Sequence, residues 1–492
     1  MRSLVPTALV LTLIITASCT SKEQKEELLA KQYCASCHTF PEPSLLDKKR
    51  WDKVMPQMAF RMGVDISAIA TLSEEDAPFV LQTLPPNPMI STEEFEAIKN
   101  YYQRKAPDSL VLPEEFVAKE LNQFEVIPRH VLKERPIVSM LRADTAKKQI
   151  WMSNRRSKLY KLDYDFKLLD SVQLTSPASN IVFENDGTFL TQMGIMDPND
   201  QPKGSVVMLN NDHSFDVVVD SIKRPVFLER ADLNKDNLED IVVCAFGNYG
   251  GALLVFENKG NGNYVRHPVN VLPGARRVIV KDFNNDGLND ILALLTQGDE
   301  QVTLYTNAGD FNFRITVLLR FSPVYGSSYF DITDFNKDGH WDILYTNGDN
   351  ADYSIMKKPY HGVRIYLNDG RNQFKESWFH AMHGCSWAVA HDFDKDGDVD
   401  IAAISFFPDF IKTPERSFIY FENIDGELEA YTTPAAAQGR WLLMETADVD
   451  SDGNTDLLLG ALDFDTGIPL SMRQAWTDKP VDVLVLRNKG KK

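Results

Sequence analysis

Hydrophobic and polar residues follow different patterns in the two parts of this chain. Up to residue 105, apolar residues recur at helical spacing between Lys- and Glu-rich stretches, which predicts helices over 22–33 and 47–62. Capping boxes at Ser73–Asp76 and Ser91–Glu94 predict two further helices. From residue 136, short apolar runs alternate with Asn, Asp and Gly, which is typical of strands and hairpins. We therefore expect a small all-α domain followed by an all-β domain.

The all-β part repeats one ten-residue string five times, at steps of 50, 52, 58 and 56 residues. Each copy lies between two short apolar strands, and a third strand with an Asn/Gly hairpin follows, so each repeat predicts four strands. Two units without the full string precede them, at 138–174 and 180–222. Residues 136–490 are therefore predicted to form a seven-bladed β-propeller, and residues 107–135 a linker.

The string has the spacing of a calcium-binding loop. Side-chain oxygens occupy positions 1, 3, 5 and 9, a carbonyl is available at position 7, and position 6 is Gly in four copies and Asn237 in the first. Several Asp residues in one short loop repel one another without a cation, so we predict calcium; the alternative is a set of ordinary turns. The predicted ligands are Asp232, Asn234, Asp236, Leu238, Asp240, Asp282, Asn284, Asp286, Leu288, Asp290, Asp334, Asn336, Asp338, His340, Asp342, Asp392, Asp394, Asp396, Asp398, Asp400, Asp448, Asp450, Asp452, Asn454 and Asp456.

Residues 34–38 read C-A-S-C-H, the motif for covalent attachment of a c-type haem. Cys34 and Cys37 are predicted to bond the haem vinyl groups, and His38 to ligate the iron. A redox C-x-x-C or zinc site is the alternative, but neither a second Cys pair nor a βαβ context is present. No other histidine precedes His130, so methionine is the expected sixth ligand. Met55, Met58 and Met62 recur at helical spacing, which also suits a buried core face.

The first nineteen residues have the pattern of an export signal, with Arg2, an apolar stretch and small residues before Cys19. The ending T-A-S-C resembles a bacterial lipoprotein box, which implies lipidation of Cys19; an ordinary signal peptide with an incidental Cys is the alternative. We therefore expect an exported protein, lipid-anchored at the cell envelope on the periplasmic or outer-membrane surface. The remaining cysteines, Cys244 and Cys385, lie in segments that are predicted to be strands, and we expect them to be buried thiols.

The net charge and the lengths of the loops limit the classes of molecule that this protein is expected to bind. A net charge of −18 argues against nucleic acid, and no apolar stretch after the N-terminus is long enough to span a membrane. The long insertions 347–362, 405–417 and 462–481 all follow the second strand of a unit, so they are expected to lie together on the face opposite the calcium loops. That face is expected to bind a carbohydrate, another small molecule or a protein; the alternative is that its side chains only pack the loops.

The repeats resemble the FG-GAP, or VCBS, repeat of integrin-type propellers. Trp51, Met58 and Gly63, followed by a capped helix ending in Tyr101 and Tyr102, resemble small bacterial cytochrome modules, which implies that Met58 is the sixth ligand. The whole chain resembles bacterial VCBS-repeat lipoproteins with a cytochrome c domain, here residues 20–106.

From the haem motif and the propeller together, we expect an extracytoplasmic protein that transfers electrons with a redox partner protein, the propeller serving as a docking or ligand-binding module. Two alternatives remain. One is an oxidoreductase in which the propeller acts on a small molecule such as a sugar and passes electrons to its own haem. The other is a surface adhesin.

Overall fold

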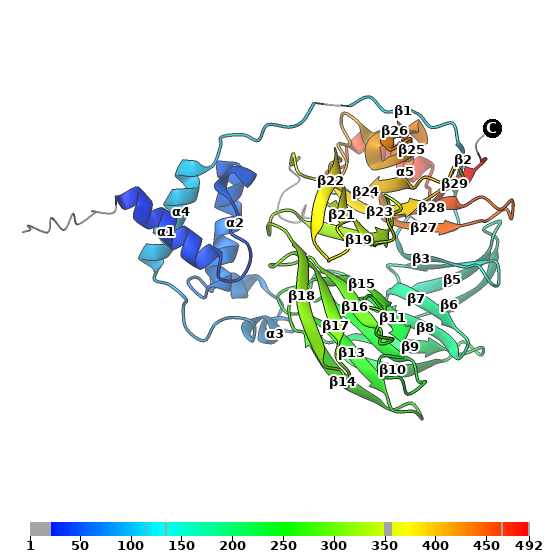
Figure 1. The fold of residues 1–492 in the computed structure, drawn as a ribbon, viewed down its shortest axis with the longest axis horizontal. Coiled ribbons are helices and arrows are strands. Elements are labelled where there is room, and N and C mark those ends of the chain that lie inside the picture. Colours follow the sequence, from blue (N-terminus) through cyan, green and yellow to red (C-terminus); the bar gives the residue numbers. More distant parts are fainter. Residues whose placement is uncertain (1–20, 115, 133–134, 349–356, 464–465, 491–492) are drawn as a thin grey trace, which may run out of the picture.

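The structure is a computed structural model that describes residues 21–490 except 115, 133–134, 349–356 and 464–465. The predicted signal peptide and Cys19 lie outside the described residues. A helical domain and a β-propeller follow one another along the chain (Figure 1). None of the described helices is both long and apolar enough to cross a membrane.

The helical domain consists of α1 (Lys22–Cys34), α2 (Lys48–Arg61), α3 (Ala77–Leu81) and α4 (Thr92–Lys105), with two 3-10 segments, Pro43–Leu45 and Ser67–Thr71. Both α1 and α4 begin with a complete capping box, at Ser21 and Ser91. The box predicted at Ser73 instead makes a turn in which Ser73 Oγ accepts from the Asp76 amide, and the short α3 begins only at Ala77. The sequence thus predicts the three long helices closely.

The core of the helical domain is aromatic. The ring centroids of Trp51 and Tyr102 lie 4.3 Å apart, and both side chains are buried. Each polar tip is satisfied by a backbone carbonyl, because Trp51 Nε1 donates to Pro43 at 2.9 Å and the Tyr102 hydroxyl donates to Pro41 at 2.8 Å. These bonds fix the loop that follows the C-A-S-C-H motif against α2 and α4.

The strands of the described residues form seven sheets, which confirms the predicted seven-bladed propeller. Six blades follow the chain in order: β3–β6 (Val138–Asp144, Gln149–Asn154, Lys158–Asp163, Leu168–Gln173), β7–β10 (Ala178–Glu184, Gly187–Gln192, Gly204–Leu209, Phe215–Ile222), β11–β14 (Pro225–Ala231, Asp240–Ala245, Ala252–Asn258, Tyr264–Asn270), β15–β18 (Ala275–Lys281, Asp290–Leu295, Gln301–Asn307, Phe313–Arg320), β19–β22 (Ser327–Thr333, Asp342–Asn347, Gly362–Asn368, Phe374–Ala381) and β23–β26 (Cys385–His391, Asp400–Ser405, Phe418–Ile424, Glu427–Thr432).

The seventh blade joins both ends of the propeller. It contains β27 (Trp441–Ala447), β28 (Asp456–Ala461) and β29 (Val483–Asn488), with helix α5 (Leu470–Asp478) between the last two strands. Its outer strand is β2 (Phe124–Arg129), which pairs antiparallel with β29. The segment expected to be a linker, 107–135, therefore closes the ring.

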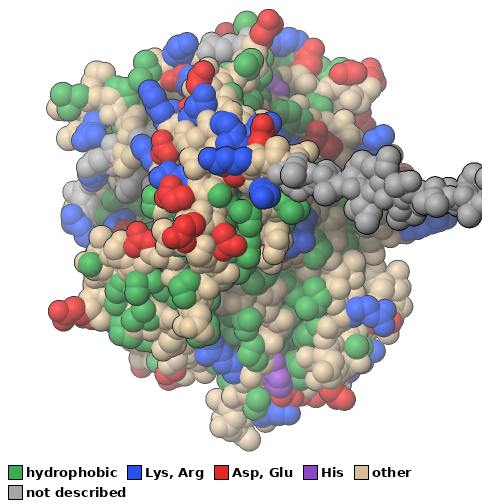
Figure 2. All heavy atoms as spheres, turned by 90° about the vertical axis from the view of Figure 1, so that its left-hand side faces the viewer, with side chains coloured by type: hydrophobic (Ala, Val, Ile, Leu, Met, Phe, Trp, Pro, Cys, Tyr) green, Lys and Arg blue, Asp and Glu red, His purple; other side chains and the backbone are tan. Residues whose placement is uncertain are grey.

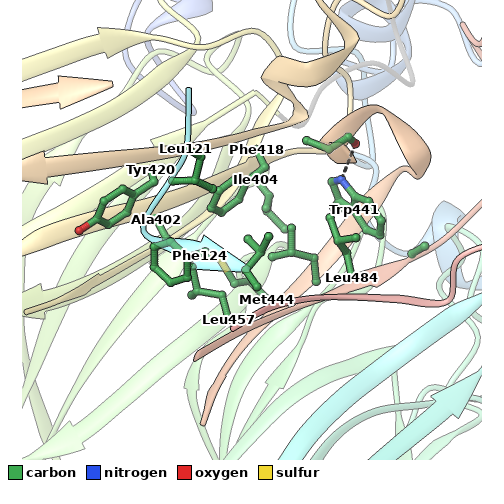
Figure 3. Packing of buried hydrophobic residues seen from close by; sticks show 14 of the residues in the cluster. Leu121, Phe124, Ala402, Ile404, Phe418, Tyr420, Trp441, Met444, Leu457 and Leu484 are labelled. Atoms are coloured by element: carbon green, nitrogen blue, oxygen red, sulfur yellow. Dashed lines mark hydrogen bonds between the residues drawn. The ribbon is translucent and has the colours of Figure 1, made fainter. Parts of the chain in front are cut away.

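A second short strand from that segment, β1 (Lys119–Glu120), pairs in parallel with β26 of the neighbouring blade. Leu121, just after β1, and Phe124, the first residue of β2, insert into the core shared by the last two blades, beside Tyr420 and Leu457 (Figure 3). Trp441 closes the same cluster and donates its Nε1 hydrogen to the Ala436 carbonyl at 2.9 Å. The segment before the propeller is thus anchored by packing as well as by strand pairing.

The second strand of each repeat that carries the string is buried along its whole length, as in β12, β16, β20, β24 and β28. Such a strand lies between two neighbours in its own sheet and between two adjacent blades, which explains the continuous apolar runs that follow position 9 of the strings. Cys244 of β12 and Cys385 of β23 are both buried and unpaired, as predicted.

The helical domain docks on the face of the propeller opposite the turns that contain the Asp-rich strings. Its contacts are made to second-to-third turns and blade-to-blade links. The Thr39 hydroxyl donates to Phe321 O at 2.7 Å, and the Tyr360 hydroxyl donates to Leu45 O at 3.0 Å. Arg61 lies 4.1 Å above the ring of Tyr249. Figure 2 looks onto this domain, where charged side chains gather above a broader area of hydrophobic ones.

Candidate cofactor site and cation loops

The C-A-S-C-H motif lies at the end of α1 and in the turn that follows it. Cys34 is the last residue of the helix, Cys37 is exposed, and His38 is half-buried. His38 Nδ1 lies 2.8 Å from the Thr39 carbonyl, which only accepts, so Nδ1 carries the hydrogen and Nε2 keeps a lone pair. The hydrogen bond of Nδ1 fixes the tautomer and the orientation of the ring, so Nε2 is positioned to ligate a metal.

Burial governs the protonation of the motif. Burial lowers the pKa of His38 and so favours the neutral, ligating imidazole. Burial also raises the pKa of the Cys34 thiol to about 11, so this cysteine is uncharged at neutral pH. Such a thiol is poorly suited to nucleophilic redox chemistry, which needs a thiolate.

Cys34, Cys37 and His38 line a cavity of about 1210 Å³ between the helical domain and the propeller. The three predicted methionines all reach it: Met55 is 3% exposed and belongs to the helical core, whereas Met58 and Met62 are half-buried. Two thiols, one neutral imidazole and several thioethers around a large cavity are the donor set that a c-type haem requires. The residues present therefore fit this group.

A fourth methionine, Met89, also lines the cavity and was not predicted. Its amide donates to the Met62 carbonyl at 3.0 Å, which brings a proline-rich segment beside the end of α2. That segment, P-P-N-P-M-I, shows no periodicity, so only the tertiary contact reveals Met89 as a candidate ligand. The geometry brings Met58, Met62 and Met89 together without selecting one.

The opposite wall of the cavity belongs to the propeller and places charged side chains among apolar ones. Charged side chains from the first strands of several blades line it, including Glu229, Arg277, Asp331 and Glu445. The cavity thus joins the haem-type motif to the mouth of the central channel.

The five strings form the turns between the first and second strands of their blades, as predicted. Of the described residues, two acidic groups satisfy the spacing for a metal site, with one ligand atom from each residue lying within 4.8 Å of the others: Asp392, Asp394 and Asp400, and Asp448, Asp450 and Asp456. These are positions 1, 3 and 9 of the last two strings. The first three strings carry Asn at position 3, namely Asn234, Asn284 and Asn336.

The string from Asp392 has an additional signal for a cation. In the strings from Asp282, Asp334 and Asp448, Oδ1 of the first Asp accepts the amide of position 5. Asp392 Oδ1 is instead buried without a hydrogen-bond partner among the described residues. A buried carboxylate oxygen left without a donor is costly unless a cation satisfies it. This loop therefore fits a calcium ion best.

Position 9 has a structural role that the sequence did not reveal. Asp240, Asp290, Asp342, Asp400 and Asp456 are all fully buried. One oxygen of each accepts the backbone amide of position 2, and the other accepts the backbone amide of an Asn in the last two residues of the third strand. These asparagines are Asn258, Asn307, Asn368, Asn423 and Asn488. A carboxylate has further lone pairs, so this role is compatible with a calcium ion.

Several aromatic residues on the long-loop face are structural. Trp441 is fully buried, Trp476 is 5% exposed, and Tyr360 packs under the helical domain with its ring 4.7 Å from that of Tyr325. Arg440 is 1% exposed and donates to the carbonyls of Phe406 and Thr466. Much of this face therefore supports loops or the docked domain.

Comparison with known proteins identifies the repeats. Residues 232–293 and 282–345 match the FG-GAP-like repeat family. No curated protein matches the chain. Similar solved structures include S. cerevisiae Dbp5 bound to Nup159, Gle1, IP6 and ADP (TM-score 0.42, 10% identity) and BBS1N in complex with ARL6DN (TM-score 0.46, 9% identity). Each alignment covers 76% of this chain and 98% of the other. This chain is thus a seven-bladed β-propeller with FG-GAP-like repeats that carries a helical domain at its N-terminal end.

Proposed function

We propose that this protein is an extracytoplasmic haem protein that transfers electrons to or from a redox partner protein. The observation that carries the proposal is the orientation of the His38 side chain. Its Nδ1 is held by the Thr39 carbonyl, which leaves the lone pair of Nε2 to ligate the haem iron. Cys34 and Cys37 line the same cavity and supply the two thiols for covalent attachment. A bound c-type haem would supply reversible one-electron transfer at its iron.

The chain's own residues have three tasks in this function. The backbone of Thr39 orients His38, the ring of Trp51 packs the cavity wall against Tyr102, and the thioether sulfur of one methionine would hold the iron together with His38. Met58 is the proposed ligand, on the resemblance to small cytochrome modules. The propeller covers the cavity, which limits access of solvent to the redox group.

Calcium is proposed as a second cofactor, bound by the strings on the opposite face. The partnerless Oδ1 of Asp392 and the neighbouring carboxylates of Asp394 and Asp400 support it. With its ions bound, the propeller would be a rigid platform for docking or for ligand binding.

The test is to express the full chain in a host that attaches c-type haem and to measure haem per chain by the pyridine haemochrome spectrum. One covalent haem is expected, with reversible reduction by dithionite and reoxidation by ferricyanide. Changing both Cys34 and Cys37 to Ala should abolish haem staining on a denaturing gel, whereas Cys244→Ala should retain it. Staining that survives the double change would refute covalent attachment.

Export and lipidation at Cys19 are proposed from the sequence alone. A Cys19→Ser variant should lose its association with membranes, because the acyl chains proposed on Cys19 would be the anchor. Cys37→Ser is the matched control and should fractionate like the wild type. Normal membrane association of Cys19→Ser would contradict lipidation.

One observation favours the alternative of an oxidoreductase. The cavity beside the C-A-S-C-H motif continues into the polar channel mouth, so a small molecule bound there would be next to the redox group. Reduction of the haem band by a candidate sugar, without added reductant, would support this alternative over a simple carrier.

A further inference from the structure

The channel mouth carries a ring of ionisable side chains that the electron-transfer function does not use. The first strands of four blades supply them: Arg142 from β3, Arg277 from β15, Asp331 from β19 and Glu445 from β27. Glu229 from β11 adds a third carboxylate. Because each comes from the innermost strand of a rigid blade, their relative positions are fixed by the propeller.

The charges in this ring nearly cancel. Arg142 lies 3.1 Å from Glu445, and Arg277 lies 3.6 Å from Asp331. The remaining carboxyl, Glu229, accepts the Val280 amide, and burial raises its pKa to about 7. Since both guanidinium groups already face a carboxylate, the ring offers no surplus positive charge to an anion, such as a haem propionate or a phosphate.

The ring and the cavity wall beside it also contain polar atoms without partners. Trp387 Nε1, Arg277 Nε and Asn180 Oδ1 are shielded from solvent and have no hydrogen-bond partner among the described residues. Two of these atoms are donors and one is an acceptor. Buried polar atoms left unsatisfied are costly, so a bound group that both donates and accepts would be favoured.

An aromatic platform lies beside these atoms. Trp387 stacks on Tyr329 with ring centroids 4.2 Å apart, and Arg277 lies 4.4 Å from the Tyr329 centroid on the cavity wall. A flat apolar surface next to unsatisfied donors and acceptors suits a molecule with C–H faces and hydroxyl edges.

We propose that this channel mouth binds a neutral polyhydroxylated small molecule, such as a monosaccharide or disaccharide. Hydroxyl groups both donate and accept, so they match the mixed set of Trp387 Nε1, Arg277 Nε and Asn180 Oδ1. The position of this ligand beside a redox group rests on the proposed haem, whereas the binding itself does not. Sugar recognition is therefore assigned to the channel rather than to the exposed rims of the long loops.

The test is isothermal titration of the full-length holoprotein with glucose, maltose and myo-inositol, and with gluconate and glucosamine as charged counterparts. At least one neutral compound is expected to bind, and more tightly than either charged one. Trp387→Leu and Asn180→Ala should each weaken binding on the order of tenfold or more, whereas Trp341→Leu, an exposed tryptophan on the calcium-loop side, should not. Melting curves will show whether each variant is folded, and Asn180→Ala keeps the test decisive if Trp387→Leu is not.

Three results would overturn the proposal: no binding of any neutral compound at millimolar concentration, tighter binding of a charged counterpart, or unchanged binding in both channel variants. Titration of the haem-free Cys34→Ala/Cys37→Ala protein separates this proposal from the haem proposal. Sugar binding that persists there supports the channel site independently, while haem content is read from the wild-type spectrum.

Discussion

The Thr39 hydroxyl donates to the Phe321 carbonyl at 2.7 Å, which joins the residue after His38 to a blade-to-blade link 282 positions later in the chain. The same Thr39 holds His38 Nδ1 with its own carbonyl. One residue thus orients the proposed iron ligand and connects it to the propeller, so the docking of the two domains and the geometry of the site are coupled.

Replacing Thr39 by Val should loosen this contact, because the methyl group cannot donate. The expected loss is about 1 kcal/mol, seen as faster amide hydrogen exchange around both 38–40 and 321–325. Thr83→Val is the matched control, since the Thr83 hydroxyl makes an equal bond of 2.7 Å within the helical domain. Faster exchange in only one of the two segments would show that Thr39 does not couple them.

Substitution of the methionines should distinguish the proposed iron ligand from the methionine that only packs the core. Met58→Ala is expected to abolish the long-wavelength absorption band of methionine-ligated ferric haem while leaving the protein folded, since Met58 is half-buried on the cavity wall. Met55→Ala should retain the band but destabilise the protein by about 2–5 kcal/mol, because Met55 is 3% exposed in the core. A band that persists in Met58→Ala and disappears in Met62→Ala or Met89→Ala would reassign the ligand.

Removing calcium should destabilise the propeller and leave the haem spectrum unchanged. An ion present at about 100 times its Kd contributes about 2.7 kcal/mol to the folded state, so chelation should lower the melting temperature. Asp392→Asn should remove the tightest site, and Asp398→Asn is the control, because its side chain pairs with Lys337 rather than with the acidic cluster. Calorimetric titration counts the sites. Equal melting with and without chelator, in metal-free protein, would reduce the strings to ordinary turns.

His380 should make the fold sensitive to acid. Burial, with a smaller effect of nearby Arg416, lowers the pKa of His380 to about 4, and its ring packs 4.3 Å from that of Phe116. The unfolded chain takes up this proton near pH 6.5 and the folded chain only near pH 4, so stability falls as pH falls through this window. The effect is on the order of 3 kcal/mol.

Denaturant unfolding of His380→Gln between pH 7 and 4 tests this directly, because the variant should lose that part of the pH dependence. His213→Gln, in an exposed hairpin, is the control and should follow the wild type. A variant whose stability changes with pH in parallel with the wild type would exclude His380 as the source.

Local patterns predicted much of this fold. Capping boxes and helical periodicity located α1 and α4, and the repeated Asp strings located the turns of five blades, because these signals lie within a few consecutive residues. Strand β2 was missed because F-E-V-I-P-R contains Pro128, which is rare within strands. As the outermost strand of its blade, β2 tolerates a residue without an amide hydrogen.

The candidate site was predicted only in part, for a similar reason. The C-A-S-C-H motif is local and carries its chemistry in five residues, so it was visible in the sequence. Met89 and the facing ring of Arg142, Arg277 and Glu445 enter the cavity only through contacts between distant segments. No local pattern encodes the docking of the helical domain on the long-loop face.

The pairing of β2 with β29 constrains the order in which this chain can mature. The Gln123 side chain, just before β2, meets Asn488, which the ribosome adds 365 residues later. Until β29 emerges, the segment that tethers the helical domain has no partner strand, and Leu121 and Phe124 have no complete core to enter. The helical domain is therefore complete before the ring can close, and the finished propeller then covers it on the channel side.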